Sequence, residues 1–195
     1  MSTTSSSHEQ LDSLRNALRK LISKTHAYNE RKHWVSLDPL WYHHKHREPY
    51  TSIVESYLDC LFGSGLQDYV LLCSDTITPA FGLLPVAMLV AHSKRCSFAV
   101  WKELGSITWG DSRLYFDSDK PVRCVVLQDV VRHGTTLLKM SEELDAKYWA
   151  IVSCVAMVKN SYDPGLLQKT LDQLANQENV ASEFFFHSLL DVSDL

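Results

Sequence analysis

One stretch, residues 124–138, limits most strongly what this chain can fold into. It reads CVVLQDVVRHGTTLL and begins with an apolar run at 125–127. A run of this length and polarity is typical of a central strand in a parallel sheet, buried on both faces. Gln128 and Asp129 then place polar groups at the carboxyl end of that strand. Ligands bind at this edge of open α/β sheets, so we expect a binding site here.

The residues after this strand predict a turn that can hold an anion. Arg132, His133, Gly134, Thr135 and Thr136 lead into a helix with apolar positions at its start. The first N–H groups of a helix lack partners within it, and the helix dipole adds positive potential there. Two threonine hydroxyls add further donors. The turn is therefore a candidate phosphate site, and the alternative is an ordinary strand-to-helix corner without a ligand.

Composition restricts the class of protein. The chain has 195 residues, 45% hydrophobic and 22% charged, which suits one globular domain with a substantial core. A net charge of −4 argues against a broad nucleic-acid surface. The five cysteines are widely spaced without a CxxC pair, as is typical of a reducing cytosol. No apolar run reaches about 18 residues. We therefore predict a soluble cytoplasmic protein with no membrane segment and no nucleic-acid partner.

Apolar runs alternate with helical patterns along residues 51–195. Strands are predicted at 69–73, 97–101, 125–127, 148–158 and 183–190, with helices between them. Alternation with short corners predicts an α/β fold, with a central, mainly parallel sheet flanked by helices. Residues 104–121 are rich in turn-forming residues and are predicted to be a mobile loop.

The first 50 residues form a separate N-terminal region in this interpretation. Residues 1–6 are predicted to be a disordered tail, and Ser7 is predicted to cap an amphipathic helix. Residues 26–50 hold five histidines and several Trp and Tyr residues. We interpret this segment as a loop-rich lobe, either a polar surface or a hood over a site, with a metal site as the weaker alternative. The predicted units are 1–6, 7–50 and 51–195, and Ser52 is predicted to cap the next helix.

The stretch 124–138 resembles the phosphoribosyl pyrophosphate (PRPP) motif of type I phosphoribosyltransferases. In that family, two adjacent acidic residues at a strand end hold the ribose, and a Thr-Thr-Gly-Thr-Thr-like loop holds the 5′-phosphate. The resemblance implies that Gln128 and Asp129 bind the ribose and that residues 132–136 bind the 5′-phosphate. Two features differ from the motif: Gln128 replaces the first acid, and an Arg-His pair replaces the small residues that open the loop.

A weaker similarity implies a pyrophosphate loop. Residues 82–87, GLLPVA, are similar to the Gly-Gly-Val/Ile-Pro-x-Ala segment of orotate phosphoribosyltransferases, in which the preceding loop binds pyrophosphate. In this chain that loop would comprise Pro79, Ala80, Phe81 and Gly82. A proline near a helix start is also favoured by helix chemistry alone, which leaves the simpler interpretation open.

Residues 101–103, WKE, resemble the Arg-Lys-Glu triplet of the same enzymes. This implies a catalytic role for Lys102 together with Asp129. Trp101 stands at the arginine position, while Gly105 and Ile107 stand where the family's flexible loop carries Lys and His. The chain's ending, LLDVSDL, also resembles the end of these enzymes, so the similarity covers about two thirds of the chain.

Two functions follow from the resemblance. The first is a glycosyltransferase that moves ribose 5-phosphate between pyrophosphate and a nucleobase, as in pyrimidine biosynthesis, with Mg²⁺ carried by PRPP and no direct protein ligation of a metal. The partners would then be small molecules, and a homodimer is expected by analogy. The alternative is a catalytically degenerate regulatory or interaction module that binds PRPP or a nucleotide. The sequence favours the transferase slightly and does not identify the base.

Overall fold

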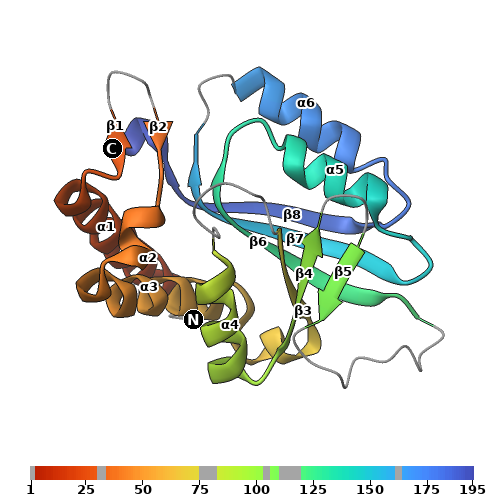
Figure 1. Cartoon of the computed structure of the whole chain (residues 1–195), viewed down its shortest axis with the longest axis horizontal. Coiled ribbons are helices and arrows are strands. Elements are labelled where there is room, and N and C mark those ends of the chain that lie inside the picture. Colours follow the sequence, from red (N-terminus) through yellow and green to blue (C-terminus); the bar gives the residue numbers. More distant parts are fainter. Residues whose placement is uncertain (1–2, 30–33, 75–82, 103–105, 110–119, 161–163) are drawn as a thin grey trace.

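The computed structural model describes residues 3–29, 34–74, 83–102, 106–109, 120–160 and 164–195. Figure 1 shows a central sheet with helices on both of its faces. This arrangement is expected when strands and helices alternate along a chain, because each crossover helix returns across a face of the sheet.

The sheet has six strands within the described residues, in the order β5-β4-β3-β6-β7-β8. Five of these strands run parallel. They are β3 (Val70–Ser74), β4 (Ser97–Lys102), β6 (Val122–Val131), β7 (Trp149–Lys159) and β8 (Val180–Asp191). Strand β5 (Ser106–Trp109) pairs antiparallel with β4 at one edge. The predicted α/β fold with a mainly parallel sheet is confirmed.

Helices cover both faces of this sheet. On one face, α1 (Thr3–Thr25), α3 (His44–Phe62) and α4 (Leu84–Lys94) share an apolar core with the strands. On the other face, α5 (Thr135–Glu143) and α6 (Pro164–Leu174) pack over a second core. Shorter elements complete the described chain: β1 (Tyr28–Asn29), β2 (Trp34–Val35), α2 (Asp38–Tyr42), and the 3₁₀ helices η2 (Gly63–Asp68) and η3 (Val192–Asp194).

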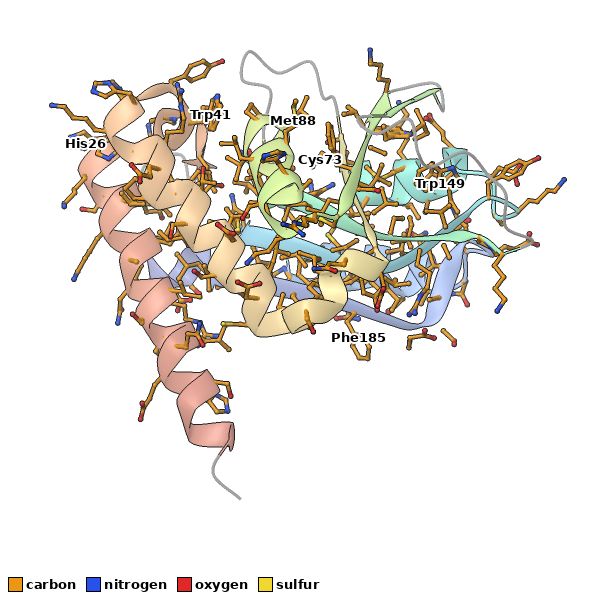
Figure 2. All side chains as sticks on the ribbon, turned by 90° about the horizontal axis from the view of Figure 1, so that it is seen from below. His26, Trp41, Cys73, Met88, Trp149 and Phe185 are labelled. Atoms are coloured by element: carbon orange, nitrogen blue, oxygen red, sulfur yellow. The ribbon has the colours of Figure 1, made fainter. Side chains whose placement is uncertain are left out.

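Strand β6 shows why the central strands are apolar throughout. Val125 and Leu127 belong to the core under α1, α3 and α4, whereas Cys124 and Val126 belong to the core under α5 and α6. Successive side chains of a strand point to opposite faces, so a strand covered on both faces needs apolar residues at every position. Figure 2 shows side chains filling the space around the sheet, with Phe185 of the edge strand β8 pointing outward.

The N-terminal helix docks by the face that the sequence predicts. Leu18, Leu21 and Ile22 are buried, with Leu11 and Leu14 partly buried beside them. The predicted helix start at Ser7 is wrong, because α1 begins at Thr3, within the segment predicted as a tail. Once a helix has nucleated, adding residues at its end is easy even for weak helix formers.

No helix in the described part of the chain has the length and apolar character needed to cross a bilayer.

Two further element boundaries differ from the predictions. Helix α3 begins at His44 rather than Ser52, so it crosses the predicted boundary between residues 50 and 51. Burial of Tyr50 stabilises this extension, although Pro49 lacks a helix N–H donor. The predicted loop at 104–121 is wrong for residues 106–109, which form β5 because the edge of β4 offers them backbone partners. Residues 110–119 lie outside the described chain.

Candidate functional site

The site begins where β6 extends past its neighbour β3. The recorded pairing with β3 ends at Val126, whereas pairing with β7 continues through Gln128 to Val131. The predicted strand end at Gln128 and Asp129 is therefore too early, because β7 still supplies hydrogen-bond partners there. Both polar residues nevertheless lie near the carboxyl end of β6, on the stretch that β7 supports, where the sequence predicts a ligand.

Gly134 makes the turn from β6 into α5. It is the residue before the first turn of α5 and has φ of +72°, in the left-handed region that side chains disfavour. A Cβ placed on it would lie 3.1 Å from Cγ2 of Thr170 and 3.3 Å from Cδ1 of Leu167, both on α6. The turn therefore needs glycine for its conformation and for the close approach of α6. The predicted order of strand, turn and helix is present, with α5 beginning at Thr135.

A cavity of about 320 Å³ lies along this corner. One part of its lining is the continuous segment 128–136, which includes every residue that the sequence predicts for ribose and 5′-phosphate binding. The other part comes from the N-terminal region, through Val35, Ser36 and Asp38. The volume is at the lower end of the range typical of small-molecule sites, roughly 300–1,000 Å³.

Asp129 provides a carboxylate in this cavity. One of its oxygens accepts a hydrogen bond from the backbone N–H of Val130, with an N···O distance of 2.7 Å. Burial raises the pKa of Asp129, and the negative charge of Asp38 raises it further, while the Val130 hydrogen bond opposes both effects. The carboxylate is thus held in fixed geometry in surroundings that disfavour its charge.

Gln128 provides an unpaired amide. Its side chain is only 9% exposed, and Nε2 has no hydrogen-bond partner among the described residues. Gln128 also lines a smaller adjoining cavity of about 70 Å³, together with Cys73, Ser74 and Thr136. A buried donor without a partner is unfavourable by about 1–3 kcal/mol, so such groups are normally satisfied by water or a ligand. Gln128 thus brings an unpaired amide donor to the lining of both cavities.

The loop supplies positive charge at the other end of the segment. Arg132 and His133 are partly buried and line the cavity next to the start of α5. Burial lowers the pKa of Arg132 from its very high ordinary value, which leaves the guanidinium charged at neutral pH. The N-terminal N–H groups of α5 add to this potential. The arrangement can hold an anion at the corner and a group rich in hydroxyls beside Gln128 and Asp129.

The second predicted catalytic residue, Lys102, does not line either of these cavities. It is exposed at the end of β4, and its Cα pairs with that of Ser106 across the β4–β5 hairpin. Trp101 is buried, and its Nε1 has no hydrogen-bond partner among the described residues. Ile107 pairs opposite Trp101 on β5. The proposed pyrophosphate-loop residues Pro79, Ala80, Phe81 and Gly82 lie outside the described residues, as does Gly105.

Asp38 and Ser36 are the polar residues of this lining that sequence reasoning missed. The Ser36 hydroxyl donates to Oδ2 of Asp38 over 2.8 Å, and Asp38 is the first residue of α2. In the sequence, Asp38 followed by Pro39 indicates a helix start and nothing more. No local signal connects either residue with β6. Within the described residues no group of three His, Cys, Asp or Glu side chains could hold a metal ion.

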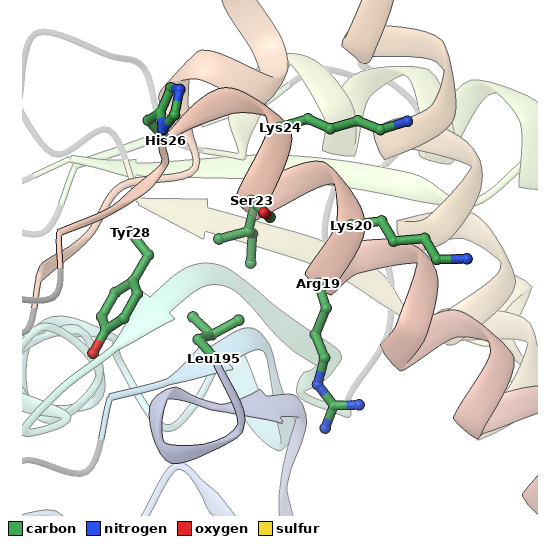
Figure 3. Close-up of a pocket in the computed structure, with 8 residues that line it drawn as sticks. Arg19, Lys20, Ser23, Lys24, His26, Tyr28 and Leu195 are labelled. Atoms are coloured by element: carbon green, nitrogen blue, oxygen red, sulfur yellow. The ribbon is translucent and has the colours of Figure 1, made fainter.

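A second pocket, of about 550 Å³, lies at the end of α1 and shares no lining residue with the cavity at the corner. Figure 3 shows Lys20 and Lys24 extending away from Tyr28 and Leu195, so the positive charges do not converge on one point. Cations near the carboxyl end of a helix offset its dipole. These residues therefore have a sufficient structural explanation, and the candidate site remains the corner between β6 and α5.

Several solved structures that share this fold are phosphoribosyltransferases, and the chain has the type I phosphoribosyltransferase fold. Orotate phosphoribosyltransferase from Aeropyrum pernix has a TM-score of 0.58 at 15% identity, over 91% of this chain and 94% of its own. Adenine phosphoribosyltransferase from Trypanosoma brucei, in complex with AMP, pyrophosphate and ribose-5-phosphate, has a TM-score of 0.58 at 14% identity, over 83% of this chain and 71% of its own.

Orotate phosphoribosyltransferase from Mycobacterium tuberculosis, in complex with PRPP, has a TM-score of 0.54 at 16% identity, over 83% of this chain and 82% of its own. No family model and no curated protein sequence matches the chain. At these identities the similarity establishes the fold, and any function has to be argued from the site.

Proposed function

We propose that this protein binds PRPP or a nucleoside 5′-phosphate at the corner between β6 and α5. The observation that carries the proposal is the cavity at this corner, in which Asp129, the unpaired amide of Gln128 and the start of α5 line one space. The 5′-phosphate would bind at Thr135 and Thr136, where helix N–H groups, hydroxyls and the nearby Arg132 provide donors. The ribose would bind beside Asp129 and Gln128.

The proposed reaction is transfer of ribose 5-phosphate between pyrophosphate and a nucleobase. The sequence motifs of the chain resemble those of orotate phosphoribosyltransferases. A nitrogen of the base forms a bond to the anomeric carbon while the bond to pyrophosphate breaks. The protein's task is to position the reactants and offset charge, which places Asp129 at the ribose and Lys102 at the departing pyrophosphate. The loop at 79–82 is proposed as the pyrophosphate-binding segment.

Mg²⁺ is proposed to arrive with PRPP, where it would offset the charge of the pyrophosphate oxygens. Asp129 is a hard oxygen donor that suits this ion, but a single carboxylate does not form a protein cage for it. We further propose, by analogy with proteins of this fold, a cytoplasmic homodimer acting in nucleotide metabolism.

A catalytically degenerate binding module is the second candidate function. Gln128 lacks the charge of the acid that it replaces in the motif, and the structure places Trp101 in the core and Ile107 in a hairpin. These positions would need cationic or proton-carrying side chains if the chain followed the orotate pattern. Ligand binding at the corner would survive their loss, whereas pyrophosphate departure would be slow.

Calorimetric titration with PRPP, with and without Mg²⁺, tests the proposal, followed by a screen of nucleobases for pyrophosphate release. Asp129→Asn should weaken PRPP and ribose 5-phosphate but not inorganic phosphate. Thr135→Val should weaken every phosphate-bearing ligand by about 1.5–3 kcal/mol, because one hydrogen bond to a charged group is lost. Thr51→Val, on α3, is the matched control. Binding of phosphate alone, insensitive to Asp129→Asn, would show a generic anion site and exclude both candidate functions.

A further inference from the structure

We propose that Asp38 is a ligand-binding residue that recognises sugar hydroxyls together with Asp129. Its carboxylate would replace the one that the motif lacks in this chain, where Gln128 stands at the position of the first acid. This inference rests on the proposed function, since it assigns the sugar subsite of the same cavity. Asp38 and Asp129 line that cavity from separate elements, α2 and β6.

The segment that carries Asp38 is fixed by backbone and core contacts. The N–H of Ser36 donates to the carbonyl of Ala27 over 2.9 Å, and Leu37 and Leu40 on either side of Asp38 are buried. The Ser36 hydroxyl holds one carboxylate oxygen of Asp38 at 2.8 Å. Asp38 is therefore oriented before a ligand arrives, which reduces the entropy lost on binding.

Two buried polar groups in this part of the molecule have no hydrogen-bond partner among the described residues, and one of them belongs to a residue that lines the cavity. Nε2 of Gln128, which lines the cavity, has no hydrogen-bond partner among the described residues. The Oη of Tyr50, on α3, is likewise without a partner in the described part of the chain, although its side chain is buried. Burial raises the pKa of Tyr50, and the charges of Asp129 and Asp38 raise it further, so both carboxylates act on one region of the molecule.

The chemistry of the lining selects the ligand class. Carboxylates accept hydrogen bonds, and an amide both donates and accepts, so these groups match a molecule with several hydroxyls. The negative charges of Asp38 and Asp129 disfavour an anionic group of the ligand beside them. The positive charge of Arg132 and the start of α5 favour an anionic group of the ligand at the corner. A divalent cation is less suitable, because the described residues offer no group of three metal-ligating side chains. The lining thus favours a sugar that carries a phosphate at its end next to the corner.

The test is calorimetric titration of the whole chain with ribose 5-phosphate and, separately, inorganic phosphate, first without Mg²⁺ and then with it. Asp38→Asn keeps the size of the side chain and can still accept from Ser36. We expect it to bind ribose 5-phosphate about tenfold more weakly or worse and inorganic phosphate as the wild type does. Glu48→Gln, an exposed residue on α3, is the control for loss of one negative charge and should bind both ligands unchanged. Asp38→Glu, which moves the carboxylate by one methylene, should also bind ribose 5-phosphate more weakly.

The outcomes separate this inference from the proposed function. If the wild type binds ribose 5-phosphate and both Asp38 variants bind it equally well, the role of Asp38 is overturned and the proposed function stands. If the wild type binds only inorganic phosphate, or neither ligand, both are overturned. If Mg²⁺ tightens binding in the wild type and Asp38→Asn removes that effect alone, Asp38 is a metal ligand and its assignment to sugar hydroxyls is wrong.

Discussion

Gly134 and Thr170 lie so close together that a Cβ on the glycine would be 3.1 Å from Cγ2 of the threonine. This contact joins the turn at the start of α5 to the middle of α6, and thereby fixes the corner that lines the cavity. Because φ of Gly134 is also positive, the position is constrained both by conformation and by space.

Gly134→Ala should lower the free energy of unfolding by about 1–2 kcal/mol, the usual penalty for an L side chain in the left-handed region. The contact with Thr170 adds to this penalty. Urea denaturation measures the change. Gly65→Ala is the matched control, since a Cβ there meets no atom within 4 Å. If the two variants are equally stable, the turn is not constrained as described.

Asn179 closes the other end of α5, and Asn179→Ala should lower the free energy of unfolding by about 1–3 kcal/mol. The side chain is 4% exposed, and Nδ2 donates to the carbonyls of Ser141 at 2.8 Å and Leu144 at 3.0 Å. Truncation leaves both carbonyls buried without this donor. Asn176→Ala removes a similar bond to Asp172, but on the surface, and should change stability by less than about 0.5 kcal/mol. Equal effects in a denaturant titration would contradict the argument from burial.

Asp129→Asn should make the protein more stable at neutral pH. Burial raises the pKa of Asp129, so the folded state holds the proton more tightly than the unfolded state does. Binding of this proton contributes its full amount to folding stability below the ordinary aspartate pKa. That contribution is lost as the pH rises through the raised pKa of Asp129 in the folded state. The gain from Asp129→Asn should therefore appear above that value and vanish toward acid pH. Unfolding midpoints of the variant and the wild type across the pH range measure this gain. A gain that grows toward acid pH would show that the pKa of Asp129 is lowered in the folded state, not raised.

Asp38→Asn should lower the pKa of Asp129, even without a ligand. The negative charge of Asp38 favours the protonated form of Asp129, so removing that charge makes deprotonation easier. NMR titration of the Asp129 carboxyl carbon measures the change. Glu48→Gln removes an equal charge from an exposed site and should leave the titration unchanged. An Asp129 titration that is insensitive to Asp38→Asn would mean that the two carboxylates do not interact.

Lys102→Ala should reduce kcat by about tenfold or more while changing the affinity for PRPP much less, if Lys102 acts on pyrophosphate mainly in the transition state. Lys102 is exposed at the end of β4 and lies outside both described cavities, so it does not line the proposed ribose and 5′-phosphate site. Single-turnover kinetics and calorimetry provide the two quantities. Lys20→Ala, in the pocket at the end of α1, is the control. Parallel losses of turnover and affinity would place Lys102 in ground-state binding.

Much of the sheet was predictable because its signals are local. The apolar run at 125–127 indicates a strand covered on both faces, and Gly134 followed by Thr135 marks a turn into a helix. The structure confirms both elements. Strand β5 was missed because residues 106–109 become a strand through pairing with β4, which no periodicity within so short a segment can reveal.

The sequence by itself determined the strand, the glycine turn and the polar residues of 128–136, since these depend on side-chain periodicity and backbone conformation over a few positions. Only the tertiary structure decided that Ser36 and Asp38 line the same cavity as Asp129. It also decided that Lys102 lies outside that cavity and that Trp101 is buried. The physical reason is that these placements depend on packing of the N-terminal segment and on sheet order, which join residues far apart in the chain. The effect of the Asp38 charge on the pKa of Asp129 is one such long-range interaction, and it has no signature in either local segment.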